Sequence, residues 1–221
     1  MIDARSIDTL RFLAVAMAFP SPQRMPIVAQ LARSLELDPV LCQPDQEQLE
    51  AAYHRLFSGQ HRCSPHETEY GPGRSVRKAV ELADIAAFYR AFNLGVDAAD
   101  PELVDHISLE LDFLAEVGFK QRYAALQGWR EQAEICQKAY RNFWEEHLGR
   151  WSPGFLENLQ QLAPEGSFYQ VLAQVALAFI LQELHQLGIT PGHLQPDRSE
   201  IPAYECLGCV EPQQGEEAHA F

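Results

Sequence analysis

The sequence is poor in basic side chains and has no apolar run long enough to span a bilayer. Lys and Arg number 17 against 31 Asp and Glu, which leaves a net charge of −14. A field of this sign repels phosphate backbones and anionic lipids and attracts basic partners. The most apolar run, residues 171–181, contains Gln174 and is well short of the roughly 18 residues that a membrane span requires. The composition therefore argues against nucleic acid as a partner and against stable membrane insertion.

Secretion and catalysis are also poorly supported. The N-terminal stretch carries Asp3 and Asp8 and has no basic segment before its apolar residues, so it is unlike a secretory signal. Five cysteines, an odd number without framework spacing, suit a reducing compartment. Neither a phosphate-binding G-x-x-x-x-G-K-[ST] loop nor a G-x-S-x-G nucleophile elbow occurs. We expect a cytoplasmic protein that is not an enzyme and carries no cofactor.

Apolar residues recur with helical spacing through most of the chain. Residues 45–59 show the pattern most clearly, with Asp45 as N-cap, Gln48 in the capping-box position and Gly59 as the stop. Helices are also expected over about 4–18, 24–36, 75–94, 127–148, 152–162 and 167–187, and after Asp100-Pro101. The 167–187 helix is apolar on most sides, which favours it as the central helix. No period-2 strand is evident.

The predicted fold is all-α, a single helical domain over residues 1–188 followed by an extended or disordered acidic tail over 189–221. The tail contains four prolines and the pair Cys206-x-x-Cys209. A long loop rich in Gly and Pro, residues 58–74, interrupts the helices, and loops of this length often carry function.

One polar pair is distinctive. Asp105 and His106 are placed one turn into the helix that follows Pro101, and Glu110 shares a face with His106 at i+4. We expect both to lie at the surface beside a buried stripe formed by Leu103, Ile107, Leu111 and Leu114. The alternative is that Asp105 only favours the helix dipole and His106 is an ordinary surface residue. An enzyme acting through this pair is least favoured, because no nucleophile accompanies it.

His61, Cys63 and His66 of the loop are residue types that bind zinc. The tail pair Cys206 and Cys209 is a further candidate for a zinc site. A single C-x-x-C is a weak signal, so we predict no metal. A metal- or nucleotide-responsive binding protein nevertheless stays as the alternative function.

Four segments occur in an order typical of one family: Y-H-R-L-F-S-G at 53–59, S-P-H-E-T-E-Y at 64–70, D-H-I-S-L-E-L-D-F-L at 105–114 and F-W-x-x-H-L-x-x-W-x-P at 143–153. Together they resemble the TorD/DmsD/NarJ-type chaperones of redox enzyme maturation, over roughly residues 45–185. The family pattern P-Y-E-S-V-Y has become Pro65-His66-Glu67-Thr68-Glu69-Tyr70, and Leu114 replaces a methionine.

The resemblance implies an all-helical cytoplasmic chaperone that binds the twin-arginine leader and the body of a molybdopterin oxidoreductase subunit before cofactor insertion and export. The client and the choice between monomer and homodimer stay open. Exposed ion pairs contribute about 0.2–1 kcal/mol each, whereas micromolar affinity needs about 8 kcal/mol. We therefore expect an apolar groove with an acidic rim. The predicted peptide-binding residues are Asp105, His106, Glu110, Tyr53, Phe57, Pro65, Glu67 and Tyr70.

Overall fold

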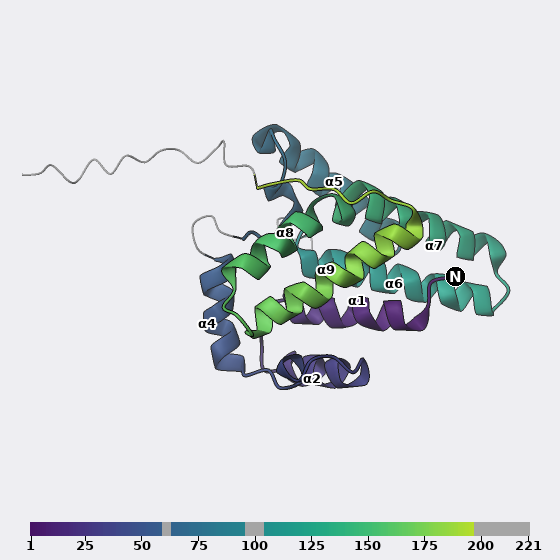
Figure 1. Ribbon diagram of the computed structural model, residues 1–221. Helices are drawn as coiled ribbons and strands as arrows, with labels where there is room; N and C mark the ends of the chain where they lie inside the picture. Colours follow the sequence, from purple (N-terminus) through teal and green to yellow (C-terminus); the bar gives the residue numbers. More distant parts are fainter. Residues whose placement is uncertain (59–62, 96–103, 197–221) are drawn as a thin grey trace, which may run out of the picture.

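The computed structural model describes residues 1–58, 63–95 and 104–196, and within them every regular element is helical (Figure 1). Two isolated bridges, His66 with His106 and Tyr70 with Pro196, are the β-type pairings found there. This confirms the predicted all-α class. The elements are α1 (Ala4–Met17), α2 (Met25–Ser34), α3 (Pro39–Cys42), α4 (Gln46–Phe57), the 3-10 turn η1 (Glu67–Glu69), α5 (Arg74–Ala91), α6 (Ile107–Leu126), α7 (Arg130–Phe143), the π-helical turn η3 (Trp144–Leu148), α8 (Gly149–Leu162) and α9 (Phe168–Leu187).

Side-chain caps start several of these helices, as the sequence predicts. The Asp45 carboxylate accepts from the backbone N–H of Gln48 at 3.2 Å and from the Gln48 side-chain amide at 3.1 Å. Asp3 caps α1 in the same way, accepting from the Ser6 N–H at 3.0 Å. Such bonds satisfy N–H groups that have no partner within the helix. The predicted stop Gly59 and the predicted cap Asp100-Pro101 lie outside the described residues.

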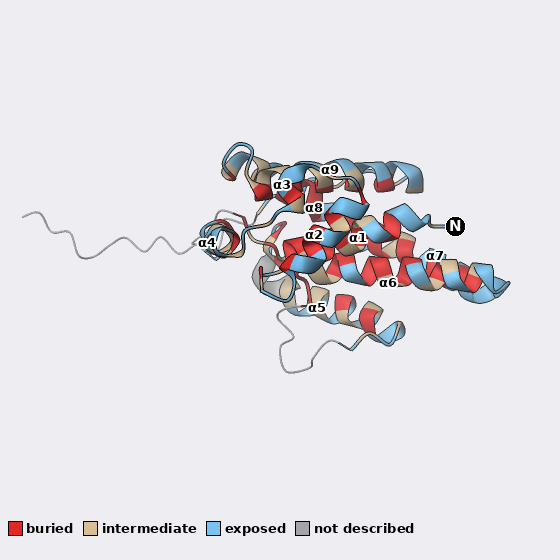
Figure 2. Cartoon of the chain, turned by 90° about the horizontal axis from the view of Figure 1, so that it is seen from below, coloured by how far each residue is buried: buried red, intermediate tan, exposed pale blue. Residues whose placement is uncertain are grey.

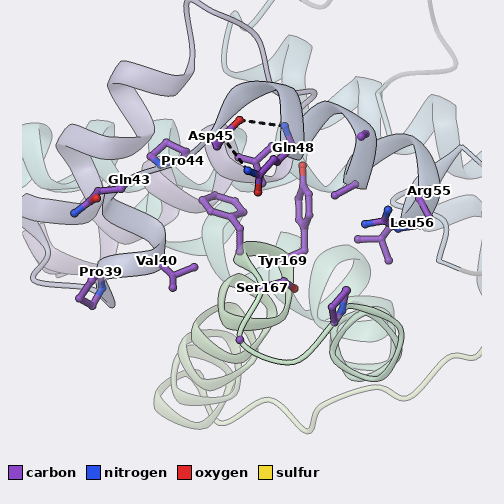
Figure 3. A pocket seen from close by; sticks show the side chains of 16 residues that line it. Pro39, Val40, Gln43, Pro44, Asp45, Gln48, Arg55, Leu56, Ser167 and Tyr169 are labelled. Atoms are coloured by element: carbon purple, nitrogen blue, oxygen red, sulfur yellow. Dashed lines mark hydrogen bonds between the residues drawn. The ribbon is translucent and has the colours of Figure 1, made fainter.

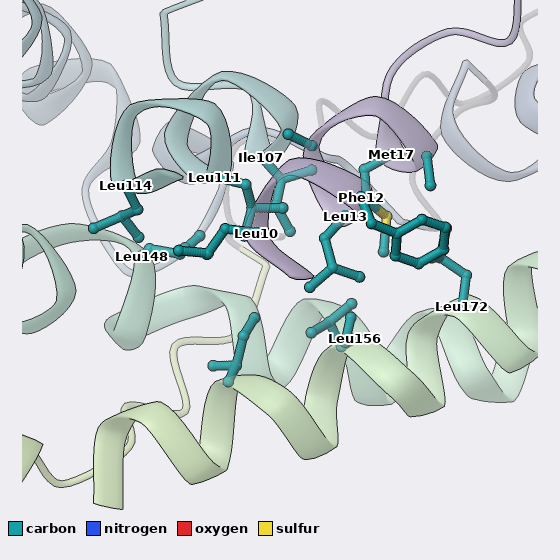
Figure 4. Close-up of a cluster of buried hydrophobic side chains, with 14 of the residues drawn as sticks. Leu10, Phe12, Leu13, Met17, Ile107, Leu111, Leu114, Leu148, Leu156 and Leu172 are labelled. Atoms are coloured by element: carbon teal, nitrogen blue, oxygen red, sulfur yellow. The ribbon is translucent and has the colours of Figure 1, made fainter. Parts of the chain in front are cut away.

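The central helix is α6, not α9. Helix α6 packs between α1 and α7, and ten of its residues are buried. Helix α9 packs mainly on α8 and leaves one side to solvent, as the burial colouring shows (Figure 2). The strongly apolar composition of residues 168–187 therefore misled the prediction of a central position. Between α1, α6, α8 and α9, the core is filled mainly by leucines, among them Leu10, Leu13, Leu111, Leu114, Leu156 and Leu172 (Figure 4).

A π-helical turn joins α7 to α8 without a break, where the sequence suggested two separate helices over 127–148 and 152–162. The turn buries Trp144, and Trp151 is buried one turn into α8. Gly149 is required at the junction, because a Cβ there would stand 2.4 Å from the Trp144 carbonyl oxygen and 2.7 Å from Leu184 of α9. None of the helices in the described residues has the length and hydropathy needed to span a membrane.

Residues 189–196 leave α9 as an extended segment and pack on the helical domain. The Gly192 N–H donates to the Gly149 carbonyl at 2.9 Å, and the Gly71 N–H donates to the Gln195 carbonyl at 2.8 Å. The segment is hydrogen-bonded to two distant parts of the chain. The boundary between residues 188 and 189 stays a prediction, since residues 197–221, with Cys206 and Cys209, lie outside the described residues.

Candidate functional site

Asp105 lies at the centre of a buried polar cluster. Its side chain is 1% exposed, and its two carboxylate oxygens accept hydrogen bonds from His66 Nδ1 at 2.9 Å and from the Thr68 hydroxyl at 2.6 Å. Burial opposes ionisation, but the bonds from His66 and Thr68 and the proximity of the His66 ring outweigh it, so the pKa of Asp105 is lowered. The expected surface position of Asp105 is therefore wrong, and Asp105 also precedes the helix, which begins at Ile107.

His106 is the N-cap of α6. Its Nδ1 accepts from the Ser108 backbone N–H at 3.1 Å, and its Nε2 lies 3.2 Å from the Tyr53 hydroxyl oxygen. Because Nδ1 accepts a backbone hydrogen bond, the proton of the neutral ring sits on Nε2 and is donated to Tyr53. Burial, followed by the nearby His66 ring, lowers the pKa of His106 to about 3. The imidazole is therefore neutral at physiological pH, and it is buried instead of reaching water at the edge of the stripe.

The loop over residues 63–70 is held against the start of α6 by backbone pairing. The Glu67 N–H donates to the Asp105 carbonyl at 3.0 Å, and the Ile107 N–H donates to the Pro65 carbonyl at 2.9 Å. The buried Tyr70 closes the loop by donating its hydroxyl to the Ser64 carbonyl at 2.8 Å. The loop is thus packed against the core in a defined conformation, and hydrogen bonds to Asp105 help to hold it there.

Beneath this loop, three ionisable side chains, Glu67, Glu110 and His147, are buried close together. His147 Nδ1 lies 3.2 and 3.3 Å from the two Glu67 oxygens, and the Trp151 indole N–H donates to Glu110 at 3.2 Å. Glu110 is fully buried, and burial together with the neighbouring Glu67 carboxylate raises its pKa well above the usual value. The raised pKa favours the neutral form of Glu110, and burial keeps its carboxyl group away from a peptide bound at the surface.

Tyr53 and Phe57, both half-buried on α4, form an aromatic wall with Tyr169 of α9. The Tyr53 and Phe57 ring centroids are 4.7 Å apart, and the Phe57 and Tyr169 centroids are 5.4 Å apart. Tyr169 also lines a pocket of about 740 Å³ between α3, α4 and the start of α9 (Figure 3). The lining is mostly apolar, and its charged members are Asp45 and Arg55. The expected apolar groove is present, but its rim carries one acid and one base and is not acidic.

Of the predicted peptide-binding residues, Tyr53 and Phe57 therefore stand beside a pocket, whereas six others are buried: Asp105, His106, Glu110, Pro65, Glu67 and Tyr70. Sequence reasoning missed the roles of Thr68, His147 and Tyr169. The His147-Leu148 dipeptide of the family pattern was a usable signal for His147. Nothing local marks Tyr169, because its pocket forms only when α4 meets α9.

Of the candidate zinc ligands of the loop, the two that the structure describes, Cys63 and His66, have other partners. Cys63 is 2% exposed, and its thiol lies 3.6 Å from the Phe155 carbonyl oxygen. Burial raises the pKa of the Cys63 thiol to about 12, so the thiolate that binds metal is disfavoured. The Nδ1 atom of His66 is used by Asp105. His61 lies outside the described residues.

An exposed aromatic cluster occupies the far end of the α6–α7 hairpin. Phe119, Tyr123, Leu126 and Trp129 are 46%, 49%, 67% and 51% exposed. The rings of Tyr123 and Trp129 are in contact, with centroids 5.7 Å apart. Apolar side chains grouped in this way, unlike single exposed ones, are typical of protein-binding surfaces.

Comparison with known proteins gives consistent relatives. Residues 27–157 match the family described as nitrate reductase delta subunit. The chain is 34% identical to the chlorate reductase assembly chaperone protein of Ideonella dechloratans, over 72% of this chain and 80% of that protein. It is 32% identical to the selenate reductase assembly chaperone protein of Thauera selenatis, over 67% of this chain and 75% of that protein. A chaperone protein TorD from Aggregatibacter aphrophilus strain NJ8700 is 26% identical over 60% of this chain and 56% of that protein.

Proposed function

Since the chain belongs to the nitrate reductase delta subunit family, we propose that it is an assembly chaperone for the catalytic subunit of a molybdopterin oxidoreductase. Membership confirms the family predicted from the four sequence segments. The observation that carries the proposal is the match to the chlorate reductase assembly chaperone, which extends over 80% of that protein. In this role the chain acts in the cytoplasm and is not a catalyst.

We place the leader of the client in the pocket between α3, α4 and α9. A volume of about 740 Å³ falls within the roughly 300–1,000 Å³ typical of ligand sites. Its apolar lining suits leucine or phenylalanine side chains, each of which contributes about 1.5–3 kcal/mol when fully buried. Three or four such side chains supply micromolar affinity after the peptide has been ordered.

The predicted site residues then divide into two roles. Tyr53 and Phe57 are close enough to the pocket to touch a leader, whereas Asp105 and His106 act on it through the position of Tyr53 and of the 63–70 loop. Asp105 is already bonded to His66 and Thr68 and does not pair with the twin arginines. The arginines are attracted instead by the overall negative charge of the protein. The body of the client, a larger surface, is the natural partner of the exposed cluster Phe119, Tyr123, Leu126 and Trp129.

A titration tests the proposal directly. The full chain is titrated calorimetrically with the leader peptide of its own client, and with a control peptide of the same composition in scrambled order. We expect micromolar or tighter binding of the leader, weakened modestly by salt, and at least tenfold weaker binding of the control. If neither the leader nor the complete client subunit associates with the chain, the chaperone function is wrong.

A further inference from the structure

Three side chains outside the pocket converge near the junction of α7 and α8. Asp84 comes from α5, and Glu146 and His147 come from the π-helical turn. One ligand atom of each lies within 4.8 Å of the others, and His147 Nε2 is 3.4 Å from a carboxylate oxygen of Asp84. His147 is 3% exposed, whereas Asp84 and Glu146 are open to solvent.

The two ring nitrogens of His147 have different surroundings. Nδ1 lies 3.2 and 3.3 Å from the two oxygens of Glu67. The other ring nitrogen is Nε2. It is buried and has no hydrogen-bond partner within the described residues, and it faces the Asp84 carboxylate. A carboxylate oxygen 3.4 Å from Nε2 favours positive charge between the two atoms, which either a proton on the ring or a metal ion supplies.

We propose that Asp84, Glu146 and His147 bind a divalent transition metal ion such as Zn²⁺. One imidazole and two carboxylates form a suitable donor set for such ions. Zinc bonds of 2.0–2.2 Å place neighbouring ligand atoms about 3.4 Å apart, which is the spacing of His147 and Asp84. The exposed carboxylates need only a small movement to close the remaining distance, and a fourth position stays open to water.

Both acidic and basic side chains surround the three ligands. Glu67 holds the His147 ring by its other nitrogen, as carboxylates commonly do behind a metal-bound histidine. Glu81 of α5 adds a further carboxylate nearby, while Arg77 pairs with Glu81 and Arg150 adds a second positive charge. Six ionisable acids and bases besides His147 therefore face this corner from α5, the 63–70 loop, the π-helical turn and α8: Asp84, Glu81, Arg77, Glu67, Glu146 and Arg150. π-Helical turns are also frequent at functional sites.

A bound ion would fasten α5 to the α7–α8 junction. Helix α5 contacts the 3-10 turn of the 63–70 loop, and its Phe88 and Tyr89 rings pack against Phe113 of α6 and Phe143 of α7. The metal would add a further attachment close to that loop. The ion is thus a structural clamp on the element that flanks the loop.

Metal titration of the full chain tests the site. Protein freed of metal by chelation and carrying no affinity tag is titrated with Zn²⁺ by calorimetry and with Co²⁺ by visible absorption. We expect one site in the parent and at least tenfold weaker binding in Asp84→Asn and in Glu146→Gln. Glu145→Gln, which removes the same charge from the neighbouring exposed residue, should bind like the parent. Zinc should raise the melting temperature of the parent and of Glu145→Gln but not of Asp84→Asn.

The tail cysteines provide a second comparison. Binding at the proposed site should persist in a variant with Cys206→Ser and Cys209→Ser. Binding that disappears in that variant and is unchanged in Asp84→Asn would overturn the proposal. So would the absence of binding combined with nitrogen NMR shifts showing both ring nitrogens of His147 protonated, because an imidazolium between Glu67 and Asp84 then supplies the missing charge.

Discussion

Tyr53 of α4 and His106 at the start of α6 are joined by a hydrogen bond of 3.2 Å between the tyrosine hydroxyl and ring Nε2. The bond connects two regions with different chemistry. On one side lies the buried cluster of Asp105, His66 and Thr68, and on the other lies the aromatic wall of the pocket. Changes in the cluster should therefore reach the pocket through the position of Tyr53.

The pocket can be filled without disturbing the core. Ala51 is an exposed lining residue of α4, so Ala51→Trp should occupy the space meant for leader side chains. We expect leader binding to weaken at least tenfold with little change in melting temperature. Ala87→Trp, at an exposed position of α5, is the matched control and should bind like the parent. Equal leader binding by both variants would place the leader elsewhere.

Asp105→Asn should destabilise the fold instead of being silent. The substitution removes the charge that strengthens the hydrogen bonds from His66 and Thr68 in a buried site. We expect a loss of about 1–3 kcal/mol in the free energy of unfolding, measured by urea denaturation. The same change at the exposed Asp8 should cost under about 0.5 kcal/mol. Indistinguishable curves for the two variants would show that the Asp105 cluster does not stabilise the protein.

His106 should make the protein less stable in mild acid. Its pKa is about 3 in the folded chain, against an ordinary histidine value of 6.5, so between these two pH values the unfolded state binds more protons. Stability therefore falls as pH is lowered from 6.5 towards 3, by at most about 1.4 kcal/mol per pH unit from this residue. His106→Asn keeps an N-cap acceptor and does not titrate. Urea denaturation at several pH values should give a shallower acid slope for the variant, and an unchanged slope would contradict the low pKa.

Glu110 should make the protein less stable as the pH rises, which is opposite to the effect of His106. Its pKa is raised in the folded chain, so above the usual carboxyl pKa the folded state holds a proton that the unfolded state has lost. Stability therefore declines as pH rises, until the folded pKa is passed. Glu110→Gln keeps an oxygen to accept from Trp151 and removes this dependence. We expect the variant to gain stability relative to the parent as the pH is raised above the usual carboxyl pKa, and a difference that is the same at every pH would contradict the raised pKa.

The extended segment, residues 189–196, should contribute more to the stability of the fold than the residues that follow it. A chain ending at Pro196 keeps the hydrogen bonds of Gly192, Leu194 and Gln195 to the domain, and we expect its melting temperature to match that of the full chain. A chain ending at Gly188 loses all three bonds, at a cost of about 0.5–1.5 kcal/mol each. Differential scanning calorimetry of both truncations decides the point. Equal melting temperatures for the two would show that the segment contributes nothing.

The sequence predicts the helices well because their signals are local. Leu49 and Leu56 repeat on one face, and Asp45 supplies the cap at the expected place, so α4 could be located within two residues of each end. The junction of α7 and α8 was missed because a π-helical turn has no distinctive residue pattern. The Trp144 and Trp151 side chains hold it through burial, which only the assembled fold provides.

The candidate site was harder to predict for the same reason. Asp105 meets His66 and Thr68 across 39 and 37 positions of sequence, and nothing near Asp105 shows that a loop will cover it. The pair was recognised by its resemblance to a family motif, but its exposure could not be inferred from helical spacing. The pocket likewise requires Tyr169 of α9 beside α4, a contact that no periodicity encodes.

The segment of residues 189–196 has a consequence for the order of synthesis. Its backbone pairs with Gly71 beside the 63–70 loop and with the first turn of α8, yet it follows all the described helices in the chain. While the protein is being made, the loop therefore lacks this neighbour until the last helix has left the ribosome, and the long-range pairing forms late. A chain interrupted before residue 189 would carry the helices but leave the edge of the loop uncovered. The surroundings of the candidate site are thus completed only after all the described helices have been synthesised.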